Sequence, residues 1–404
     1  MPDAVVVATA RSPIGRAHKG SLKDARPDDL AAQMVRALLA KVPALDPRSI
    51  DDLILGCARP EGEAGFNMAR VVAVLADLDD VPGTTVNRFC SSSVQTSRMA
   101  MHAVRAGEGD AFLSVGVEAV SRYGRVAAAG PEALENPAFA AARARTERIA
   151  AGGQDWSEPR EEGWLPDIYI SMGQTAENVA RFRDVSRADQ DAYAVRSQHR
   201  AEAAGADGFW AREITPVTLP DETVVETDDS PRAGVTIEAV SALPPVFRPG
   251  GTVTAGNSCP LNDGAAAVLI MSDTKASELR LTPLARIVST GVSALSPEIM
   301  GLGPVEASRR ALRQAGLTMR DIDLVEINEA FAAQVIASAR ELGVDEDRLN
   351  VNGGAIALGH PFGMTGARMT TTLINSLERH DKQLGLLTMC VGGGQGMALV
   401  LERL

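Results

Sequence analysis

Residues 84–95 read Thr84-Thr85-Val86-Asn87-Arg88-Phe89-Cys90-Ser91-Ser92-Ser93-Val94-Gln95. Val86 and Phe89 suit a short strand, and the three serines favour a helix start because their hydroxyls accept free N–H groups of a first turn. The helix is expected to end at Gly107, a common terminator. Cys90 then lies at a strand–helix junction, where the helix dipole favours a thiolate and lowers the thiol pKa toward neutrality. The stretch predicts a nucleophilic cysteine, and the alternative is a buried cysteine that packs as a small apolar side chain.

The composition is that of a large globular chain. Its 404 residues exceed the size at which one core usually divides, so two or three domains are expected. The net charge of −12 argues against a nucleic-acid-binding protein. No apolar run reaches the roughly 20 residues of a membrane span, and the N-terminus lacks a signal-peptide pattern. The cysteines are scattered without metal-ligand spacing, which is typical of a reduced, cytoplasmic protein; they are Cys57, Cys90, Cys259 and Cys390.

Strand-like and helix-like segments alternate over most of the chain. The expected strands include 3–8, 52–57, 84–89, 111–115, 265–271, 284–289, 324–327, 349–351, 384–389 and 397–401. The expected helices between them include 28–41, 67–78, 91–106, 305–314, 329–342 and 365–377. Because strands and helices alternate, the pattern predicts an α/β fold with layered helices and mixed or parallel strands.

The two ends of this alternation look duplicated. Three short matches lie 272, 270 and 274 positions apart: Ile50-Asp51 with Ile322-Asp323, Arg98-Met99 with Arg368-Met369, and Leu113 with Leu387. Each match is weak, but the nearly constant offset favours duplication. Duplicated halves would place their helix N-termini around a shared pseudo-two-fold site. Cys90 would then lie near its counterpart close to residue 360.

Residues 121–249 interrupt the alternation. The segment 125–165 is rich in Ala, Arg and Glu, helices are expected at 172–183 and 188–204, and prolines divide the rest. We therefore predict an inserted domain at 121–249, an N-terminal half formed by 1–120 plus 250–274, and a C-terminal half at 275–404. The plain alternative for the insertion is a helical elaboration without chemistry.

Three polar clusters stand at strand ends in the second half. Asn328 follows a strand and suits either ligand binding or a helix cap. His360 lies in the glycine-rich run 352–363, fixed between Gly359 and Pro361. Cys390 begins Cys390-Val391-Gly392-Gly393-Gly394-Gln395-Gly396, where glycine N–H groups suit an oxyanion hole and the alternative is a tight hairpin with an incidental cysteine. No helix follows that run, so it is not a dinucleotide-binding loop.

These side chains form a recognisable chemical set. A cysteine and a histidine make a nucleophile–base pair, and a second cysteine indicates a second proton transfer. At these residues the chain resembles the thiolase family of acetyl-CoA C-acyltransferases over nearly its whole length. The resemblance rests on 86–92, Thr254-Ala255-Gly256-Asn257, Asn328-Glu329-Ala330-Phe331, 353–361 and 390–394. It implies two duplicated βαβαβαββ halves in a layered αβαβα arrangement, with an inserted helix and loop domain.

The resemblance also implies a division of roles. Cys90 is the nucleophile that takes the acyl group, and His360 activates it. Cys390 protonates the departing acetyl-CoA enolate and then deprotonates the incoming CoA. Asn328, through a water, and His360 form one oxyanion hole, whereas the backbone N–H groups of Cys90 and Gly392 form the other. Two negative charges that develop at different positions require two sets of donors.

Coenzyme A is implied as a substrate, with no metal and no permanently bound cofactor. Its implied contacts are Met172, Ser258, Cys259, Ala330 and Phe331. Arg181, Arg183 and Arg232 could meet its phosphates, but solvated surface arginines are the plain alternative. Family members are commonly oligomeric, so a homodimer or homotetramer is expected.

Four departures from the family pattern stand out. Ser93 replaces the usual glycine after Cys-Ser-Ser, Cys259 replaces a serine near the pantetheine, and Ser171 replaces the histidine of short-chain biosynthetic members. The segment 125–165 is longer than usual. Ser171 favours degradative thiolysis of 3-ketoacyl-CoA, as in fatty-acid β-oxidation. The alternatives are synthesis of acetoacetyl-CoA and, from another class, a non-catalytic acyl-CoA-binding relative; a decarboxylating ketoacyl synthase is disfavoured because that class lacks the 390–394 loop.

Overall fold

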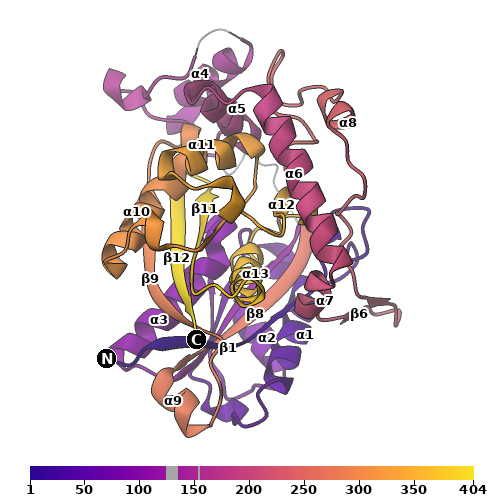
Figure 1. Cartoon of the computed structure of the whole chain (residues 1–404), viewed down its shortest axis with the longest axis vertical. Coiled ribbons are helices and arrows are strands. Elements are labelled where there is room, and N and C mark those ends of the chain that lie inside the picture. The colour runs from indigo at the N-terminus through magenta and orange to yellow at the C-terminus, as the bar shows by residue number, and fades with distance from the viewer. Residues whose placement is uncertain (124–134, 153–154) are drawn as a thin grey trace.

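The computed structural model describes residues 1–123, 135–152 and 155–404. Its centre is a 10-stranded sheet in the order β10-β11-β12-β9-β1-β8-β5-β3-β4, with β2 paired to β8 (Figure 1). The strands are β1 (Ala4–Arg11), β2 (Gly15–Arg16), β3 (Asp52–Gly56), β4 (Gly83–Val86), β5 (Ala111–Ala119), β8 (Asn262–Ser272), β9 (Ala285–Ala294), β10 (Leu324–Ile327), β11 (Leu384–Val391) and β12 (Gln395–Arg403). The predicted alternation is confirmed, with boundaries that shift by a few residues.

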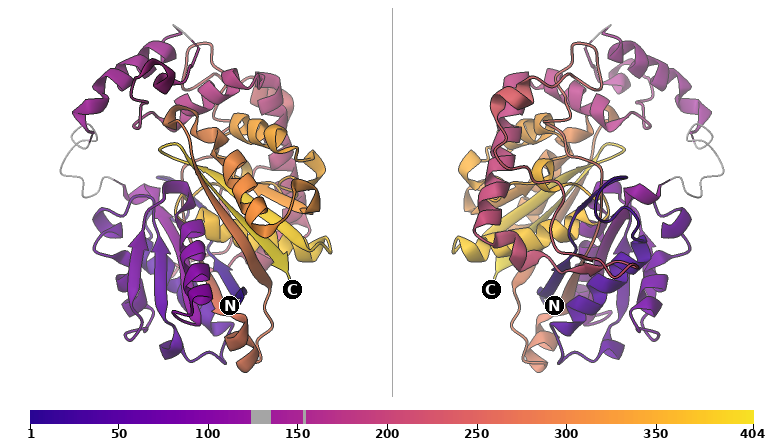
Figure 2. Two further views of the ribbon diagram at one scale, coloured as in Figure 1. Left: turned by 90° about the vertical axis from the view of Figure 1, so that its left-hand side faces the viewer. Right: turned by 90° about the vertical axis from the view of Figure 1, so that its right-hand side faces the viewer.

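Strand pairing repeats between the halves. In the first half β3 and β5 are parallel, and β8 lies antiparallel between β5 and β1. In the second half β10 and β11 are parallel, and β12 lies antiparallel between β11 and β9. The halves join where Val5 pairs with Arg286 and Val6 with Ala285. The predicted duplication is therefore visible as two copies of one strand pattern (Figure 2).

One predicted strand is wrong. In the first half β4 pairs in parallel with β3, but the equivalent 349–351 is reduced to a single bridge between Val325 and Leu349. Asn350 has a φ of 46°, which breaks the extended backbone. Its side-chain amide replaces the backbone hydrogen bonds that a paired strand would make. Oδ1 accepts the N–H of Ile327 at 2.8 Å, and Nδ2 donates to the Ile327 carbonyl at 2.9 Å.

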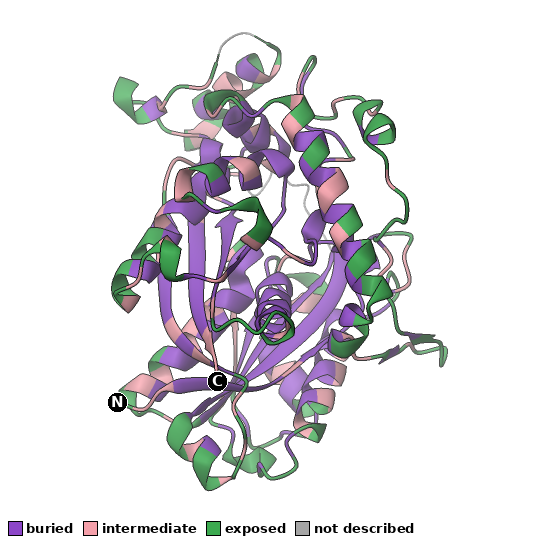
Figure 3. Ribbon diagram, viewed as in Figure 1, coloured by how far each residue is buried: buried purple, intermediate pink, exposed green. Residues whose placement is uncertain are grey.

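Helices and strands alternate in five layers. The central layer is the pair α3 (Ser92–Ala106) and α13 (Thr365–Arg379), which shares a core with both halves of the sheet. α1 (Pro27–Ala40) and α2 (Met68–Leu75) cover the outer face of the first half. α10 (Gly303–Ala315) and α11 (Ala332–Leu342) cover that of the second. Strands and central helices are almost wholly buried in Figure 3, so the N-termini of α3 and α13 are fixed by dense packing.

The segment between β5 and β8 covers both halves (Figures 1 and 2). It contains α4 (Ala140–Ala150), α5 (Met172–Phe182), α6 (Arg187–Ala206), α7 (Phe209–Glu213), α8 (Ile237–Ser241) and a hairpin of β6 (Val217–Thr218) and β7 (Val224–Val225). Its helices α4, α5 and α6 lie over the second half, whereas its β6–β7 hairpin packs beside α1 of the first half. The hairpin is not predicted by the sequence pattern. Of the segment 125–165, residues 125–134 and 153–154 lie outside the described residues. The smaller α9 (Asp273–Glu278) and α12 (Ala355–Leu358) follow β8 and precede His360.

Candidate active site

Cys90 stands on a tight turn between β4 and α3. Asn87 Oδ1 accepts the N–H of Phe89 at 2.7 Å, which closes the turn directly after the strand. Phe89 adopts a φ of 42°, the left-handed region that bulky residues rarely occupy. Ser92 completes the turn, because its Oγ accepts the N–H of Arg88 at 2.9 Å and donates to the Phe89 carbonyl at 2.7 Å. The predicted strand–turn–helix is confirmed, with a strained residue immediately before Cys90.

The serines do not cap α3 as expected. Ser91 occupies the N-cap position without a side-chain capping bond, and its hydroxyl donates to Arg88 O instead. Ser92 bonds within the preceding turn. Ser93 Oγ accepts the N–H of Ala367, which belongs to α13. The hydroxyls therefore fix the turn and the neighbouring helix rather than the first turn of their own.

Burial governs the acidity of Cys90. The side chain is almost fully enclosed, which raises the thiol pKa to about 11. The nearby backbone N–H groups of Gly392 and of Cys90 itself lower the pKa, but by less than burial raises it. The predicted shift toward neutrality is therefore wrong. The same two N–H groups are the pair expected to form an oxyanion hole, and both act on the Cys90 thiol.

His360 is held as a neutral base. Its Nδ1 lies 2.7 Å from Thr365 Oγ1, whose own proton goes to the Pro361 carbonyl at 2.7 Å. Thr365 can therefore only accept, so Nδ1 carries the imidazole proton. Nε2 therefore keeps its lone pair, and it accepts a hydrogen bond from Asn328 Nδ2 at 3.2 Å. Burial and then the charge of Arg368 lower the His360 pKa to about 3, which keeps the ring uncharged at neutral pH.

The backbone around His360 is fixed from the first half. Asn262 Oδ1 accepts the N–H of His360 at 2.9 Å, and Glu118 Oε2 accepts that of Gly363 at 2.9 Å. Gly359 has a φ of 114°, and a Cβ there would lie 2.6 Å from the Asn262 amide. Only glycine fits this approach. The glycine frame that the sequence indicated thus holds His360 against strands β5 and β8.

Cys390 lies at the end of β11, fully buried, where the chain turns through Gly392, Gly393 and Gly394 into β12. Burial, followed by the nearby thiols of Cys90 and Cys259, raises its pKa well above the usual value. Gly393 and Gly394 both have a φ of 76°, which permits the tight turn. The structure therefore brings Cys90, Cys259 and Cys390 into one neighbourhood.

The residues expected to contact CoA cluster beside Cys390. Phe331, Ala330 and Cys390 share one apolar group, against which Met172 packs. The backbones of Ser258 and Phe331 form an isolated antiparallel β-bridge, and Cys259 N donates to Ala330 O at 3.1 Å. The Ser258 hydroxyl donates to Thr254 O at 2.7 Å. All five predicted contact residues therefore line one region.

The arginines expected near the CoA phosphates differ in their surroundings. Arg181 pairs with Asp155 at 2.7 Å and Arg183 pairs with Glu341. Arg232 is exposed. In the described ranges no group of three or more His, Cys, Asp and Glu side chains is arranged to hold a metal ion. No helix in those ranges is long and apolar enough to cross a membrane.

Comparison with known proteins identifies the family. The thiolase N-terminal domain matches residues 4–274, and the thiolase C-terminal domain matches residues 281–403. The chain belongs to the thiolase family. It is 44% identical over 415 residues to a 3-ketoacyl-CoA thiolase of Bacillus subtilis (strain 168), covering 100% of both chains. It is 42% identical over 412 residues to a beta-ketoadipyl-CoA thiolase of Acinetobacter baylyi, again covering 100% of both.

A solved structure shares the thiolase fold. The crystal structure of the Bacillus anthracis acetyl-CoA acetyltransferase aligns with a TM-score of 0.86 at 38% identity, covering 100% of this chain and 99% of that one. The predicted fold and the predicted acyltransferase class are confirmed by these comparisons.

Two buried carboxylates that hold the thiolase site have no role in the sequence-based prediction. Glu298 accepts from Arg145 Nη2 at 2.7 Å, Trp156 Nε1 at 2.7 Å and Asp167 N at 2.8 Å, which fastens the inserted segment to the second half. Glu329 accepts from Tyr193, Ser197, Asn350 and the N–H of Ile356. Glu329 stands beside Asn328 in a quoted motif and could have been singled out, whereas the sequence around Glu298 carries no such signal.

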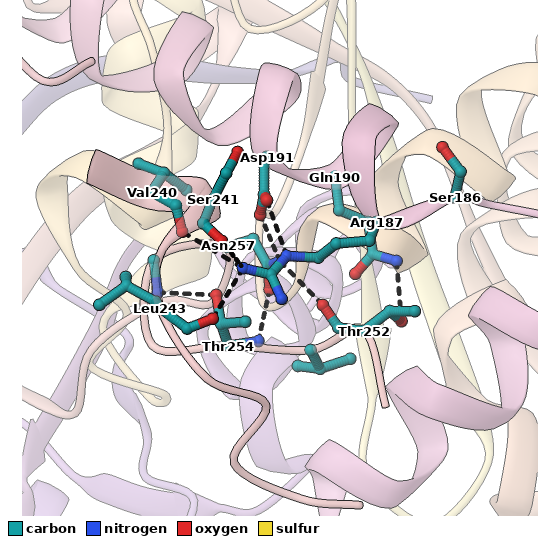
Figure 4. A network of polar contacts seen from close by, with 12 residues as sticks. Ser186, Arg187, Gln190, Asp191, Val240, Ser241, Leu243, Thr252, Thr254 and Asn257 are labelled. Atoms are coloured by element: carbon teal, nitrogen blue, oxygen red, sulfur yellow. Dashed lines mark hydrogen bonds and ion pairs between the residues drawn. The ribbon is translucent and has the colours of Figure 1, made fainter. Parts of the chain in front are cut away.

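A third network fixes the Thr254–Asn257 turn of the thiolase motif (Figure 4). Asp191 of α6 accepts from Asn257 Nδ2 at 2.9 Å and from Arg187 Nε at 2.7 Å. Asn257 Oδ1 in turn accepts the N–H of Thr254 at 2.8 Å. Arg187 also donates to the carbonyls of Val240, Ser241 and Leu243. The turn next to Ser258 and Cys259 is therefore anchored to the inserted helices.

Proposed function

We propose that this thiolase cleaves 3-ketoacyl-CoA with CoA, giving acetyl-CoA and a shortened acyl-CoA. The observation that carries the proposal is the neutral His360. Thr365 holds the imidazole proton on Nδ1, so Nε2 keeps a lone pair, and Asn328 contacts that nitrogen. A base in this state can accept a proton from a thiol, and Cys90 and Cys390 are two buried thiols that lie close to each other.

In the proposed first half-reaction, Cys90 Sγ attacks the 3-keto carbon while His360 Nε2 takes the thiol proton. The negative charge develops on the former 3-keto oxygen, which is bonded to the carbon that Sγ attacks. The backbone N–H groups of Cys90 and Gly392 act on the Cys90 thiol and lower its pKa, so they lie close enough to be proposed as donors to that oxygen. The C2–C3 bond then breaks, leaving the acyl group on Cys90 and the enolate of acetyl-CoA, which takes a proton from Cys390. His360 and Asn328, through a water, are proposed to stabilise the enolate oxygen.

In the proposed second half-reaction, the Cys390 thiolate takes the proton of an incoming CoA thiol. The CoA sulfur attacks the thioester carbonyl, the Cys90–acyl bond breaks to release the shortened acyl-CoA, and His360 returns its proton to the departing Cys90 sulfur. The contacts proposed for CoA are Met172, Ser258, Cys259, Ala330 and Phe331. Coenzyme A is a substrate in this scheme, without a permanently bound cofactor. A cytoplasmic location and a homodimer or homotetramer remain predictions.

The degradative direction is supported by relatives named 3-ketoacyl-CoA thiolase and beta-ketoadipyl-CoA thiolase. The alternative, condensation of two acetyl-CoA molecules, is favoured by the relative named acetyl-CoA acetyltransferase. The apolar side chains nearest the Gly392–Gly393 turn are Phe89, Met172 and Ile168, which suits an acyl chain longer than two carbons.

Thiolysis rates on 3-ketoacyl-CoA substrates of increasing chain length test this proposal. We expect turnover of chains beyond acetoacetyl-CoA, with an acyl adduct on Cys90 in mass spectra after mixing with substrate and without CoA. Activity confined to acetoacetyl-CoA would contradict the degradative direction. An adduct on Cys390 or Cys259 would contradict the roles, and the absence of any adduct or turnover would favour the non-catalytic acyl-CoA-binding alternative.

A further inference from the structure

The first turns of α3 and α13 are joined by one hydrogen bond. Ser93 Oγ of α3 accepts the N–H of Ala367 in α13 at 2.9 Å. Both helices have 15 residues and begin at 92 and 365. Counted from the first residue of each helix, Ser93 and Gly366 both stand second, and Gly366 is next to the hydrogen-bond partner of Ser93. The two halves meet here through a serine on one side and a glycine on the other.

The surroundings of Ser93 leave space for its hydroxymethyl group and little more. The side chain is fully buried. A Cβ on Gly116 would lie 2.7 Å from Ser93 Oγ, and one on Gly366 would lie 2.9 Å from it. Both distances are too short for a real side chain, so two glycines on two elements make room for this hydroxyl.

The hydroxyl supplies a capping bond that α13 otherwise lacks. Met364 occupies the N-cap position and has no side chain that can cap. The first N–H groups of a helix need external acceptors, and a buried N–H without one is costly. Ser93 provides that acceptor from a different helix.

The bond connects the surroundings of the two reacting groups. Ser93 follows Cys90 by three residues, within the rigid turn and first helical turn. Ala367 follows Thr365 by two residues, and Thr365 accepts the Nδ1–H of His360. A displacement of α13 along α3 would therefore move His360 relative to Cys90.

We propose that Ser93 is a positioning residue that sets the placement of His360 against Cys90 through its bond to Ala367. The inference rests on the proposed roles of Cys90 and His360. A glycine, which the family resemblance leads us to expect at this position, could not make the bond.

The test compares Ser93→Ala and Ser93→Gly with a matched control, Ser97→Ala. Ser97 is equally buried on the same helix, and its hydroxyl bonds to Ser93 O and Ser114 Oγ without touching α13. The measurements are kcat and KM for thiolysis and the rate at which substrate acylates Cys90 in the absence of CoA, followed by mass spectrometry. Thermal unfolding shows whether the variants lose stability to a similar degree.

We expect Ser93→Ala to lower kcat about tenfold because a small misplacement of a catalytic group has a large kinetic effect. KM should change by less than about twofold, and the acylation of Cys90 should slow by about the same factor as kcat. Ser97→Ala should keep the wild-type kcat and acylation rate. Equal kcat losses in Ser93→Ala and Ser97→Ala, or a wild-type acylation rate in Ser93→Ala, would overturn the inference.

The second variant keeps the test decisive if Ser93→Ala does not fold, since Ser93→Gly makes the same comparison with the smallest residue. A separate arm looks for the acyl adduct on Cys90 of the wild-type chain. Its absence overturns the proposed function together with the inference. Its presence with an unaffected Ser93→Ala or Ser93→Gly variant overturns only the role of Ser93.

Discussion

Asn328 Nδ2 lies 3.2 Å from His360 Nε2, and Asn328 Oδ1 has no hydrogen-bond partner among the described residues although it is buried. The amide therefore faces the base with its donor and leaves an acceptor for a bound water, since buried polar atoms are nearly always satisfied. This arrangement requires an amide rather than a carboxylate, because a carboxylate would attract a proton to Nε2.

Asn328→Asp should accordingly abolish most of the activity. A carboxylate beside Nε2 raises the His360 pKa and keeps the ring protonated, so the base is lost. We expect kcat to fall by about 100-fold, within the range of a lost acid–base group. Asn352→Asp is the control, since Asn352 is buried and bonds to Ser376 away from His360. Steady-state thiolysis measures both, and equal effects would count against a specific role for Asn328.

Alkylation of Cys90 without substrate should require alkaline solution. Its thiol pKa is raised to about 11 by burial, so the reactive thiolate is scarce at pH 7. The rate of iodoacetamide labelling, followed on the Cys90 peptide by mass spectrometry, should rise continuously from pH 7 to 10. A plateau below pH 8 would mean that the thiolate is stabilised in the free protein.

His360 should make the protein less stable in mild acid. Its pKa falls from 6.5 in the unfolded chain to about 3 in the folded one. Between these pH values His360 is protonated in the unfolded chain and neutral in the folded chain. The free energy of unfolding therefore falls as the pH falls from 6.5 toward 3. The wild-type free energy of unfolding, relative to His360→Asn, should decrease by about 1.4 kcal/mol per pH unit in this window. Urea unfolding at pH 6.5, 5.5 and 4.5 measures it, and a constant difference would contradict the buried neutral ring.

Glu298→Gln should loosen the inserted segment. The change removes the charge that pairs with Arg145 and leaves donors without an acceptor in a buried place. We expect a loss of about 1–3 kcal/mol in the free energy of unfolding. KM should rise more for long 3-ketoacyl-CoA chains than for acetoacetyl-CoA, because Asp167 and the adjacent Ile168 near Gly393 lose their anchor. A uniform KM across chain lengths would place the acyl chain elsewhere.

The sequence predicts local structure and the members of the site better than their electrostatics. The strand–helix junctions at Cys90 and Asn328 follow from patterns of apolar residues and serine, and the glycine frame of His360 follows from its glycine-rich run. The acidity of Cys90 does not, because a helix terminus is local whereas burial depends on parts of the chain far away in the sequence. The strand expected at 349–351 fails for a similar reason, since the bonds of Asn350 to Ile327 become visible only in the folded chain.

Contacts between distant segments account for the remaining gaps. Ser93 is noticeable in the sequence as a departure, but its partner Ala367 lies 274 residues away. Glu298 is an ordinary acidic residue until Arg145 and Trp156 converge on it. The duplication is the exception, because its offset predicts that α3 and α13 share one place, and both helices form the central layer.

Thr365→Val should impair catalysis through the imidazole tautomer. Thr365 Oγ1 accepts the Nδ1–H of His360, and without it the proton is free to move to Nε2, which would then no longer be a base. Loss of a residue that fixes a catalytic tautomer can cost up to about 10⁴-fold in kcat, and we expect at least a 100-fold loss here. Thr371→Val is the matched control, because Thr371 is buried on the same helix and its hydroxyl donates only to Ala367 O. Raising the pH should not restore Thr365→Val, since a neutral ring with the wrong tautomer does not titrate back. Recovery of activity at high pH would show instead that Thr365 acts by suppressing protonation of the ring.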